Sequence, residues 1–409
     1  MKILIISQYF WPESFLINSI VLDLKSQNIN VEVLTGKPNY PGGKILSGYK
    51  KYQKEVNWHY GVKIYRVPIF PRGKSSLTLL LNYISFVFSG IFFAKGLLRN
   101  SNYDLIFVYA PSPIFQVLVG IYIKKIKNIP LILNIQDLWP ESIVAAGKIK
   151  NKLIIYFIRY VVCLIYQRCD LILCQSKSFV TSIKEISDNK KIIFFPNTVD
   201  RIFLSKNEIS DNLLIPKSEI FSVIFAGNIG SAQSIHTLLL SALALHSNKN
   251  IKFYIYGDGR EKENAVKFAK SHQLSNVYFC GRLPINEMPR IFDGASLLAL
   301  TLANAPVFSL TIPNRLQAYM SRGRPIVAAI NGEGADIIKR AKCGIAVDAE
   351  NSISLAKAIE EIYRMPSQQR AELGNNAYLY FKENFHPDAL LLRLKNIFNE
   401  VGENLKRST

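Results

Sequence analysis

The stretch FSVIFAGNIGSAQS, from Phe221 to Ser234, joins an apolar β-type run to a glycine-containing turn and then to a helical pattern. Gly227 and Gly230 let a ligand approach the backbone closely, and the helix that follows offers free amide groups to a phosphate. Taken alone, such a segment is an ordinary strand-to-helix turn. This segment decides the predicted fold because the same order of strand, turn and helix recurs along the chain.

Short apolar runs alternate with helical patterns almost from end to end. The strand candidates of the first half are KILIIS, VEVLT, KIYRVP, DLIFVYA, LILNIQ, LILCQ and IIFFP. Those of the second half are FSVIFAGN, IKFYIYGDG, NVYFCG, SLLALT, PIVAAI and GIAVD. This alternation predicts mostly parallel sheets with right-handed crossovers. We therefore predict an α/β protein of two Rossmann-like, doubly wound domains facing a cleft, with ligands at the carboxyl ends of the strands.

A polar stretch without clear periodicity follows PNTVD (Pro196 to Asp200) and indicates a linker. We predict an N-terminal domain over residues 1–200 and a C-terminal domain over residues 218–382. Residues 383–409 are predicted to form a C-terminal helix that crosses back to the first domain. The N-terminal MKILIISQYFWPE has too short an apolar stretch for a signal peptide and indicates a first strand.

The net charge of the chain calls for a polyanionic partner. Lys and Arg exceed Asp and Glu by 50 − 30 = 20, with +14 in residues 1–200 (25 basic, 11 acidic) and +6 in residues 201–409 (25 basic, 19 acidic). No zinc-finger spacing and no basic tract with interleaved aromatic residues supports nucleic acid. We therefore predict an anionic membrane surface as the partner.

The segment LTLLLNYISFVFSGIFFAKGLL, from Leu77 to Leu98, is long enough to span a bilayer. Polar residues interrupt it, and a spanning helix would cut the strand–helix alternation in half. We therefore favour a buried or interfacial amphipathic helix, without excluding insertion. Seven nearby basic residues fit an interfacial role: Lys50, Lys51, Lys54, Lys63, Arg66, Arg72 and Lys74.

The cysteines and histidines do not predict a metal site. The five cysteines form no CxxC pair and lie mostly in apolar runs, which is typical of a reduced, cytoplasmic protein. The five histidines are scattered, and no DxD-like pair ends a strand. We predict that the protein needs neither a cofactor nor a metal.

The stretch IPNRLQAYMSRGRP, from Ile312 to Pro325, predicts a helix that starts at Pro313 and Asn314. Arg315 then lies in the first turn, where the helix dipole favours an anion over a cation. Arg315 is therefore either a solvated surface residue or the partner of a bound anion. The glycine-containing turns after the second-half strands, including YGDG at Gly257, favour the second interpretation because they converge on the same end of the sheet.

The order of these motifs resembles the GT-B glycosyltransferases, in particular the large retaining family 4, over essentially the whole chain. The strings that carry the resemblance are YFWPES, LTGKPNYPGGK, QDLWPES, PNTVD, AGNIGSAQS, GDG, CGRLP and TIPNRLQAYMSRGRPIVAAINGEGA. The PNYPGGK, DLWPES and GNIGSAQ strings are similar to those of the bacterial surface-polysaccharide subgroup. That subgroup includes the colanic acid enzymes and the WbuB-type L-fucosaminyltransferases.

The resemblance implies that the second domain binds a UDP-sugar as substrate. It implies that Arg315 contacts the diphosphate, beside Asn314 at the helix start. It places Arg282 and Leu283 at the nucleobase. The remaining donor-side residues it implies are Gly227, Asn228, Gly230, Gln233 and Gly257 in the strand-end turns, and Ser309, Leu310 and Thr311 in a loop whose amides meet the sugar or the diphosphate.

Three motifs depart from the pattern of the broad family. Asn228 and Gln233 stand where that family has Arg and Lys. Its E-x7-E motif is replaced by Leu310 and Ala318, and the neighbouring Gln317 points about 100° away on a helix. The first-domain histidine of the family aligns with Gln136 or Asp137. Arg315 is therefore expected to supply more of the positive charge that contacts the phosphates.

The resemblance implies retaining transfer by a front-face mechanism, in which the leaving diphosphate oxygen takes the proton of the incoming hydroxyl. Asp137 and Glu13 are the candidate carboxylates of the first domain, for positioning the acceptor or taking its proton. Their alternative role is to cap helix starts.

The acceptor in this subgroup is a sugar on undecaprenyl diphosphate at the inner leaflet. The resemblance therefore implies a peripheral protein on the cytoplasmic face of the inner membrane, acting in O-antigen or capsule synthesis. The transferred sugar would be an N-acetylated, 6-deoxy hexosamine such as L-FucNAc. Two alternatives stay open: an enzyme similar to the UDP-N-acetylglucosamine 2-epimerase, and a non-catalytic nucleotide-sugar-binding subunit.

Overall fold

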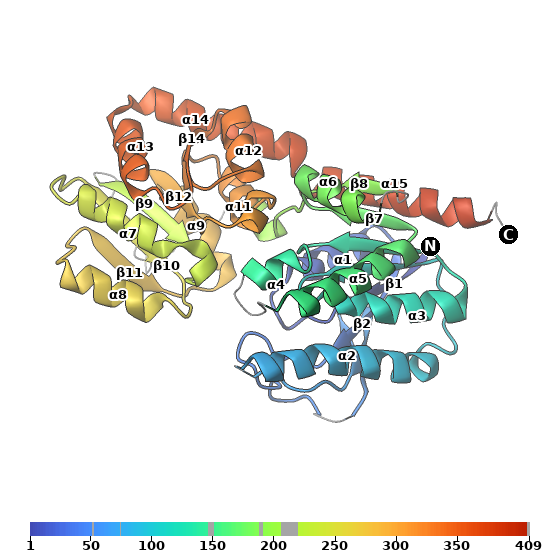
Figure 1. Ribbon diagram of the computed structural model, residues 1–409. Coiled ribbons are helices and arrows are strands. Elements are labelled where there is room, and N and C mark those ends of the chain that lie inside the picture. The colour runs from blue at the N-terminus through green and yellow to red at the C-terminus, as the bar shows by residue number, and fades with distance from the viewer. Residues whose placement is uncertain (51–52, 74, 146–150, 188–190, 206–219, 407–409) are drawn as a thin grey trace. The chain divides into compact units, whose positions relative to one another are not determined.

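The computed structural model describes residues 1–50, 53–73, 75–145, 151–187, 191–205 and 220–406 (Figure 1). The chain divides into two compact units, of which unit 1 comprises Met1–Phe195 with Asp388–Thr409 and unit 2 comprises Pro196–Pro387. The chain thus changes unit five residues before the expected end of the first domain. It changes again at Asp388, and not at residue 383. The predicted linker lies mostly outside the described residues.

Unit 1 is built on an eight-stranded sheet with the order β3-β4-β2-β1-β5-β6-β7-β8, in which only the β3–β4 pair is antiparallel. Its strands are β1 Lys2–Ile6, β2 Asn30–Gly36, β3 Glu55–His59, β4 Val62–Val67, β5 Leu105–Ala110, β6 Leu131–Ile135, β7 Leu171–Cys174 and β8 Ile192–Phe194. The seven strands predicted for this half are confirmed. The sequence did not indicate β3, because this edge strand has one face in solvent and an EVNWH sequence without an apolar run.

Helices cover both faces of this sheet. They are α1 Leu16–Ser26, α2 Ser76–Leu97, α3 Val117–Lys127, α4 Glu141–Ala145, α5 Lys152–Arg168, α6 Lys177–Ile186 and α15 Pro387–Lys406. Helices α1 and α15 share one apolar core with the sheet. Helix α3 packs on the opposite face, where Gly120 lies against Val108 and Leu131, and α2 and α5 pack on either side of α3 (Figure 1).

Unit 2 is built on a six-stranded parallel sheet with the order β11-β10-β9-β12-β13-β14. Its strands are β9 Phe221–Ala226, β10 Ile251–Tyr256, β11 Val277–Gly281, β12 Leu297–Thr301, β13 Ile326–Ala329 and β14 Gly344–Val347. Its helices are α7 Ile235–Ala244, α8 Lys262–Ser271, α9 Met288–Asp293, α10 Pro306–Ser309, α11 Asn314–Ser321, α12 Glu333–Ala341, α13 Ser352–Arg364 and α14 Ser367–Asn384. All six strands predicted for this half are confirmed.

Each strand order reverses once, and the reversal positions a site in each unit. In unit 1 the order runs outward from β1 in one direction and from β5 in the other; in unit 2 the same is true of β9 and β12. Open α/β sheets bind ligands outside the carboxyl ends of the strands at such a switch point. The loops after β1, β5, β9 and β12 are therefore the expected positions of ligand-binding and catalytic residues.

Candidate active site

Backbone hydrogen bonds from two glycines connect the loops that follow β9, β10 and β11 in unit 2. The amide of Gly227 donates to the carbonyl of Tyr256 over 2.9 Å, and the amide of Gly257 donates to the carbonyl of Gly281 over 2.7 Å. A Cβ atom on Gly257 would lie only 1.9 Å from the carbonyl oxygen of Gly227. Glycine is thus required for this spacing, and the turns after β9, β10 and β11 form one continuous backbone surface.

Arg315 lies against this backbone surface. The predicted helix is confirmed as α11, with Leu316, Tyr319 and Met320 fully buried. A Cβ atom on Gly227 would lie 3.0 Å from Cδ of Arg315, and the guanidinium lies 4.6 Å from the ring centroid of Phe225.

The guanidinium of Arg315 has an unmet donor. Its Nη2 donates to the carbonyl of Thr301 over 3.4 Å, whereas its Nη1 is buried without a hydrogen-bond partner. Burial lowers the pKa of Arg315, opposed by Tyr319. A buried N–H donor without an acceptor is costly. The unpaired Nη1 of Arg315 thus favours binding of an anion between the ends of β9 and β12.

Asn228 and Gln233 pair with each other and not with a charged group. Nδ2 of Asn228 donates to Oε1 of Gln233 over 3.2 Å, and the amide of Gly230 donates to the same oxygen over 3.3 Å. The hydroxyl of Thr301 donates to the backbone carbonyl of Gln233 over 2.5 Å, which joins the loop after β9 to the end of β12. These two side chains therefore shape the loop, and neither supplies a positive charge.

The other predicted donor-side residues follow strand ends in the same unit. Arg282 is exposed and Leu283 half-buried directly after β11. Asn314 accepts a hydrogen bond from Nδ2 of Asn197 over 2.8 Å, which joins PNTVD to the start of α11.

The loop from Phe308 to Thr311 differs from the expectation of free amides. Ser309 ends α10, and the amides of Leu310 and Thr311 both donate to the carbonyl of Phe308. The hydroxyl of Thr311 donates to the carbonyl of Val307 over 2.9 Å. A ligand that uses these two amides must compete with their contacts inside the turn.

Gln317 is directed into its own helix. The side chain is fully buried, and in the amide orientation that its neighbours favour it donates to the carbonyls of Pro313 over 2.8 Å and Asn314 over 3.1 Å. It therefore does not replace the carboxylate that is missing at Ala318.

The switch point of unit 1 is occupied by a buried network of neutral polar side chains. The amide of Gln8, after β1, donates to Oε1 of Gln116, after β5, over 2.8 Å. Nε2 of Gln8 donates to Oδ1 of Asn82 in α2 over 2.7 Å. Asn82 in turn donates to Oδ1 of Asn39 over 3.2 Å and to the carbonyl of Phe70 over 2.6 Å. The polar interruption that the sequence shows inside the apolar helix thus ties α2 to the loops of the switch point.

Glu13 holds the loop that contains the PNYPGG motif. Its Oε1 accepts hydrogen bonds from the amides of Asn39 and Tyr40, each over 2.7 Å, and its Oε2 accepts one from Phe10 over 3.2 Å. The alternative role as a helix cap is not what the structure shows, since α1 starts at Leu16 without a side-chain cap. Both carboxylate oxygens already bind backbone amides, which favours a role in shaping the site.

Burial raises the pKa of Glu13 from 4.5 to about 7, against the opposing effect of the three amide hydrogen bonds. Because the folded pKa lies above the unfolded value, the folded chain binds this proton more tightly. The stabilisation is full below the unfolded pKa and is lost as the pH rises from 4.5 through about 7. We expect Glu13→Gln to remove this pH dependence and to cost about 1–3 kcal/mol through the unpaired amide of Phe10.

Urea unfolding of both proteins across this pH range measures the difference, with Glu383→Gln at an exposed position as the control. A Glu13→Gln protein whose stability follows the same pH profile as the original would contradict this assignment.

Asp137 has a different environment from Glu13. It is half-buried after β6, and Oδ2 accepts a hydrogen bond from the amide of Ser112 over 3.1 Å. Burial raises the pKa of Asp137, and the hydrogen bonds from Ser112 oppose the rise. The indole of Trp139 donates to Oγ of the same serine over 2.9 Å. Asp137 is thus a half-buried carboxylate that Ser112 holds at the carboxyl end of the sheet.

Arg72 is the functional candidate that the sequence reasoning did not single out. Its Nη1 donates to the hydroxyl of Tyr9 over 3.2 Å, and its guanidinium lies 5.0 Å from the ring centroid of Tyr40. The pKa of Tyr83 is raised by burial, lowered by Arg72 and raised by Asp137, so both charges act on one side chain. The sequence placed Arg72 only among nearby basic residues, because its position depends on aromatic contacts from distant segments.

Arg66, in contrast, is wrongly predicted as an interfacial cation. It is fully buried and donates to the carbonyl of Trp11 over 2.5 Å and to Oδ1 of Asn57 over 2.8 Å. The expected residues Lys51 and Lys74 lie outside the described residues. Within the part of the chain that the structure describes, no group of three His, Cys, Asp or Glu side chains is arranged to hold a metal ion.

Comparison with known proteins assigns the class. Residues 19–202 match the family model described as Glycosyltransferase Family 4, and residues 221–365 match the model described as Glycosyl transferases group 1. The probable glycosyltransferase WbjE of Pseudomonas aeruginosa is 25% identical over 303 residues, which cover 72% of this chain and 74% of that protein.

Solved structures share the fold. Sucrose-phosphate synthase from Thermosynechococcus elongatus superposes with a TM-score of 0.77 at 16% identity, covering 98% of both chains. Anabaena HepE in complex with UDP and glucose superposes with a TM-score of 0.69 at 18% identity, covering 98% of this chain and 99% of that chain.

Two parallel α/β sheets, each with its switch point, together with these likenesses define a GT-B fold. The chain is accordingly an enzyme of the glycosyltransferase class, with one family match mostly in unit 1 and the other within unit 2. The alternatives of an epimerase-like enzyme and a non-catalytic subunit give way to this assignment.

Proposed function

We propose that this glycosyltransferase transfers an N-acetylated hexosamine, 6-deoxy as in L-FucNAc, from a UDP-sugar to a sugar on undecaprenyl diphosphate, in O-antigen or capsule synthesis. The observation that carries the donor half is the unpartnered Nη1 of Arg315 beside Gly227. UDP as the nucleotide is supported by the complex of the structurally similar HepE with UDP and glucose. The bacterial subgroup named from the PNYPGGK, DLWPES and GNIGSAQ strings supports the sugar and the acceptor.

The chemistry follows from the charges available. The acceptor hydroxyl oxygen attacks the anomeric carbon, the bond from that carbon to the β-phosphate oxygen breaks, and the hydroxyl proton passes to the leaving phosphate oxygen. Arg315 stabilises the charge that develops on the diphosphate. Asp137 orients the acceptor hydroxyl. Because attack and departure occur on one face, the product keeps the anomeric configuration of the donor. We propose that the reaction needs no metal or cofactor.

Arg72 is the proposed partner of the acceptor diphosphate. The described contacts of its guanidinium are with tyrosines and not with a carboxylate, and Arg72 lies four residues before α2. We expect Arg72→Ala to raise the KM for a lipid-diphosphate acceptor by about ten- to a hundredfold, because a charge-assisted hydrogen bond is lost. The affinity for UDP, measured by calorimetry, stays unchanged.

Arg72→Lys keeps the charge and is the matched variant, expected to recover part of the loss. Equal KM values for all three proteins would exclude Arg72 from the acceptor site.

A lipid surface is the proposed location, on the cytoplasmic face of the inner membrane. Of the described residues, one helix, Leu77–Leu97, is long and apolar enough to cross a bilayer. The buried hydrogen bonds of Asn82 favour the interfacial arrangement, since insertion across a bilayer would break all of them. The opposite face of α2 is exposed and apolar, at Leu77, Leu81, Ile84, Phe88 and Phe92.

The function is tested with the purified chain, a short-chain GlcNAc-diphosphate-lipid, and a panel of UDP- and GDP-sugars. Mass spectrometry of the lipid is expected to show addition of one N-acetylated hexosamine from one UDP-sugar only. NMR of that product is expected to show retention at the anomeric carbon. Transfer from a GDP-sugar, or an inverted product, would contradict the proposal.

A further inference from the structure

Helix α5 has an exposed face that is as apolar as a protein core. Leu153 is 80% exposed, Tyr156 75%, Phe157 64% and Tyr160 57%. The opposite face of α5 is buried against the rest of unit 1 and contains Ile158, Val162, Ile165 and Tyr166. Both faces of a helix are apolar when both are covered. The outer stripe, Leu153, Tyr156, Phe157 and Tyr160, therefore calls for a covering partner.

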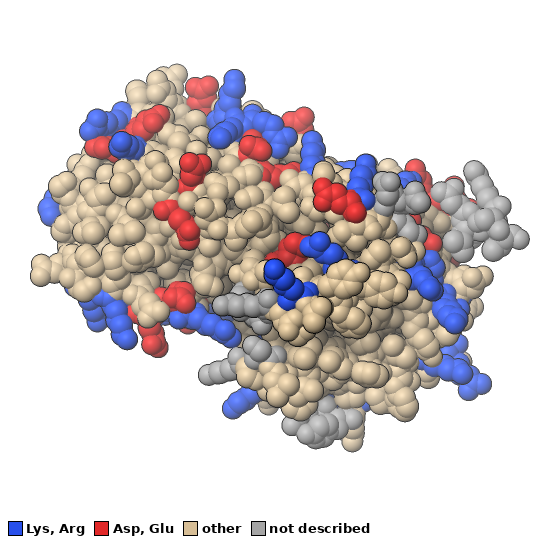
Figure 2. All heavy atoms as spheres, in the orientation of Figure 1, with Lys and Arg blue, Asp and Glu red and all other residues tan. Residues whose placement is uncertain are grey.

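The layer that contains α5 is basic as well as apolar. Helices α2, α3 and α5 contain no Asp or Glu and seven Lys or Arg residues: Lys95, Lys124, Lys125, Lys127, Lys152, Arg159 and Arg168. Acids from neighbouring elements pair with two of them, Lys124 with Asp170 and Arg159 with Glu141. Figure 2 shows a mostly uncharged surface over α2 and α5 with basic side chains at its margin. Such a surface complements anionic lipid head groups around an apolar interior.

We infer that the outer stripe of α5 is a second membrane-contacting surface, separate from the outer face of α2. This inference rests on the proposed function only because that function places unit 1 at a lipid surface. A second copy of the chain is the less suitable partner. A two-fold interface would bring this basic surface against itself, and these three helices offer no carboxylate to offset the repulsion.

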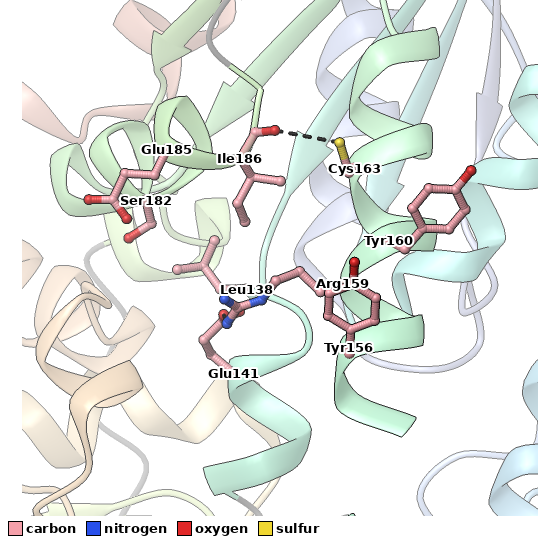
Figure 3. A pocket seen from close by; sticks show the side chains of 9 residues that line it. All are labelled: Leu138, Glu141, Tyr156, Arg159, Tyr160, Cys163, Ser182, Glu185 and Ile186. Atoms are coloured by element: carbon pink, nitrogen blue, oxygen red, sulfur yellow. Dashed lines mark hydrogen bonds and ion pairs between the residues drawn. The ribbon is translucent and has the colours of Figure 1, made fainter. Parts of the chain in front are cut away.

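The hollow beside α5 has a mixed lining, in which Ser182 and Glu185 are polar, and it does not supply an anion site. It has a volume of 480 Å³ and lies between α5 and α6 (Figure 3). Leu138, Tyr160, Cys163 and Ile186 contribute its apolar wall. The guanidinium of Arg159 faces the carboxylate of Glu141 over 2.9 Å, so its charge is already paired (Figure 3). The outer stripe, and not this hollow, is therefore the apolar contact surface of α5.

The test is co-sedimentation of the full chain with vesicles of phosphatidylglycerol and phosphatidylethanolamine, without donor or acceptor. We expect the triple variant Leu153→Ser/Tyr156→Ser/Phe157→Ser to lower partitioning by about tenfold or more, because the apolar area entering the interface is lost. The α2 variant Phe88→Ser/Phe92→Ser is expected to lower partitioning independently. The effects of the α2 and α5 substitutions are expected to add when they are combined. The matched control Ile353→Ser/Leu379→Ser changes exposed apolar residues of unit 2 and leaves partitioning unchanged.

Thermal unfolding and UDP affinity, both expected to be unaltered, show that the α5 variant is folded. Unchanged partitioning of that folded variant would overturn the inference. So would light scattering showing that the original chain is a dimer and the α5 variant a monomer, since the occupant would then be a second copy. The proposed reaction is judged apart from this result by transfer to a short-chain acceptor in solution, which the α5 variant is expected to retain.

Discussion

Arg315→Ala is expected to lower kcat for sugar transfer by about 10²–10³-fold, because the principal positive charge on the departing diphosphate is lost. Nη1 of Arg315 is buried without a partner, and the side chain lies beside Gly227, which leaves this N–H group available to a diphosphate oxygen. The affinity for UDP is expected to fall as well, since the product carries the same diphosphate. Transfer rates from a saturating UDP-sugar and calorimetry with UDP measure the two effects.

The protein with alanine at this position is expected to be at least as stable as the original, because truncation removes a buried, incompletely paired cation. Arg315→Lys is the matched variant and is expected to retain part of the activity, because an ammonium keeps the charge but not the planar pair of donors. Full activity of a folded Arg315→Ala protein would exclude the residue from the reaction.

Gly257→Ala is expected to destabilise unit 2 by about 2–4 kcal/mol, in the range of a severe backbone clash. The φ angle of Gly257 is +148°, and an added Cβ atom would lie 1.9 Å from the carbonyl oxygen of Gly227. Relief of this overlap requires the loops after β9 and β10 to separate, which moves Gly227 away from Arg315. UDP affinity is therefore expected to fall together with stability.

Gly42→Ala is the control, since nothing lies within 4 Å of a Cβ atom at that position and its φ angle is not positive. Thermal unfolding in the presence and absence of UDP separates the two effects of the Gly257 change. If Gly257→Ala unfolded at the same temperature as the original and bound UDP equally well, the stacked glycine loops would not be the donor surface.

The sheets could be predicted from the sequence because every buried parallel strand is a short apolar run. All thirteen predicted runs are strands in the structure. The edge strand β3 was missed because its polar and apolar residues alternate without an apolar run, and its apolar residues, Val56 and Trp58, are exposed. Helix α11 was predictable for a similar local reason, since Pro313, Gly323 and Pro325 delimit it.

The roles of polar side chains were less predictable, because each depends on contacts between distant segments. Asn82 looked like an interruption of an apolar helix, whereas its partners Gln8 and Asn39 lie more than forty residues away in the sequence. Glu13 looked like a catalytic acid or a helix cap, whereas its partners are the amides of the next loop. No local pattern encodes such pairings.

The turn glycines were more predictable than the cation of unit 1. Gly227 and Gly257 were predicted as glycines of strand-to-helix turns, and the structure places both in turns after strands with positive φ angles. Arg72 was not found, since its orientation is set by stacking on Tyr40 and a hydrogen bond to Tyr9. A cation held by aromatic residues has no fixed spacing in sequence.

The most direct test of the central claim is to measure, in one reaction of the purified chain, the UDP released and the glycosylated lipid formed. The reaction contains one UDP-linked N-acetylated hexosamine and a short-chain lipid-diphosphate sugar. Equal amounts of the two products, with no UDP released when the lipid is omitted, are the predicted result. UDP released without glycosylated lipid, or clear UDP binding with neither product for any donor of the panel, would contradict it.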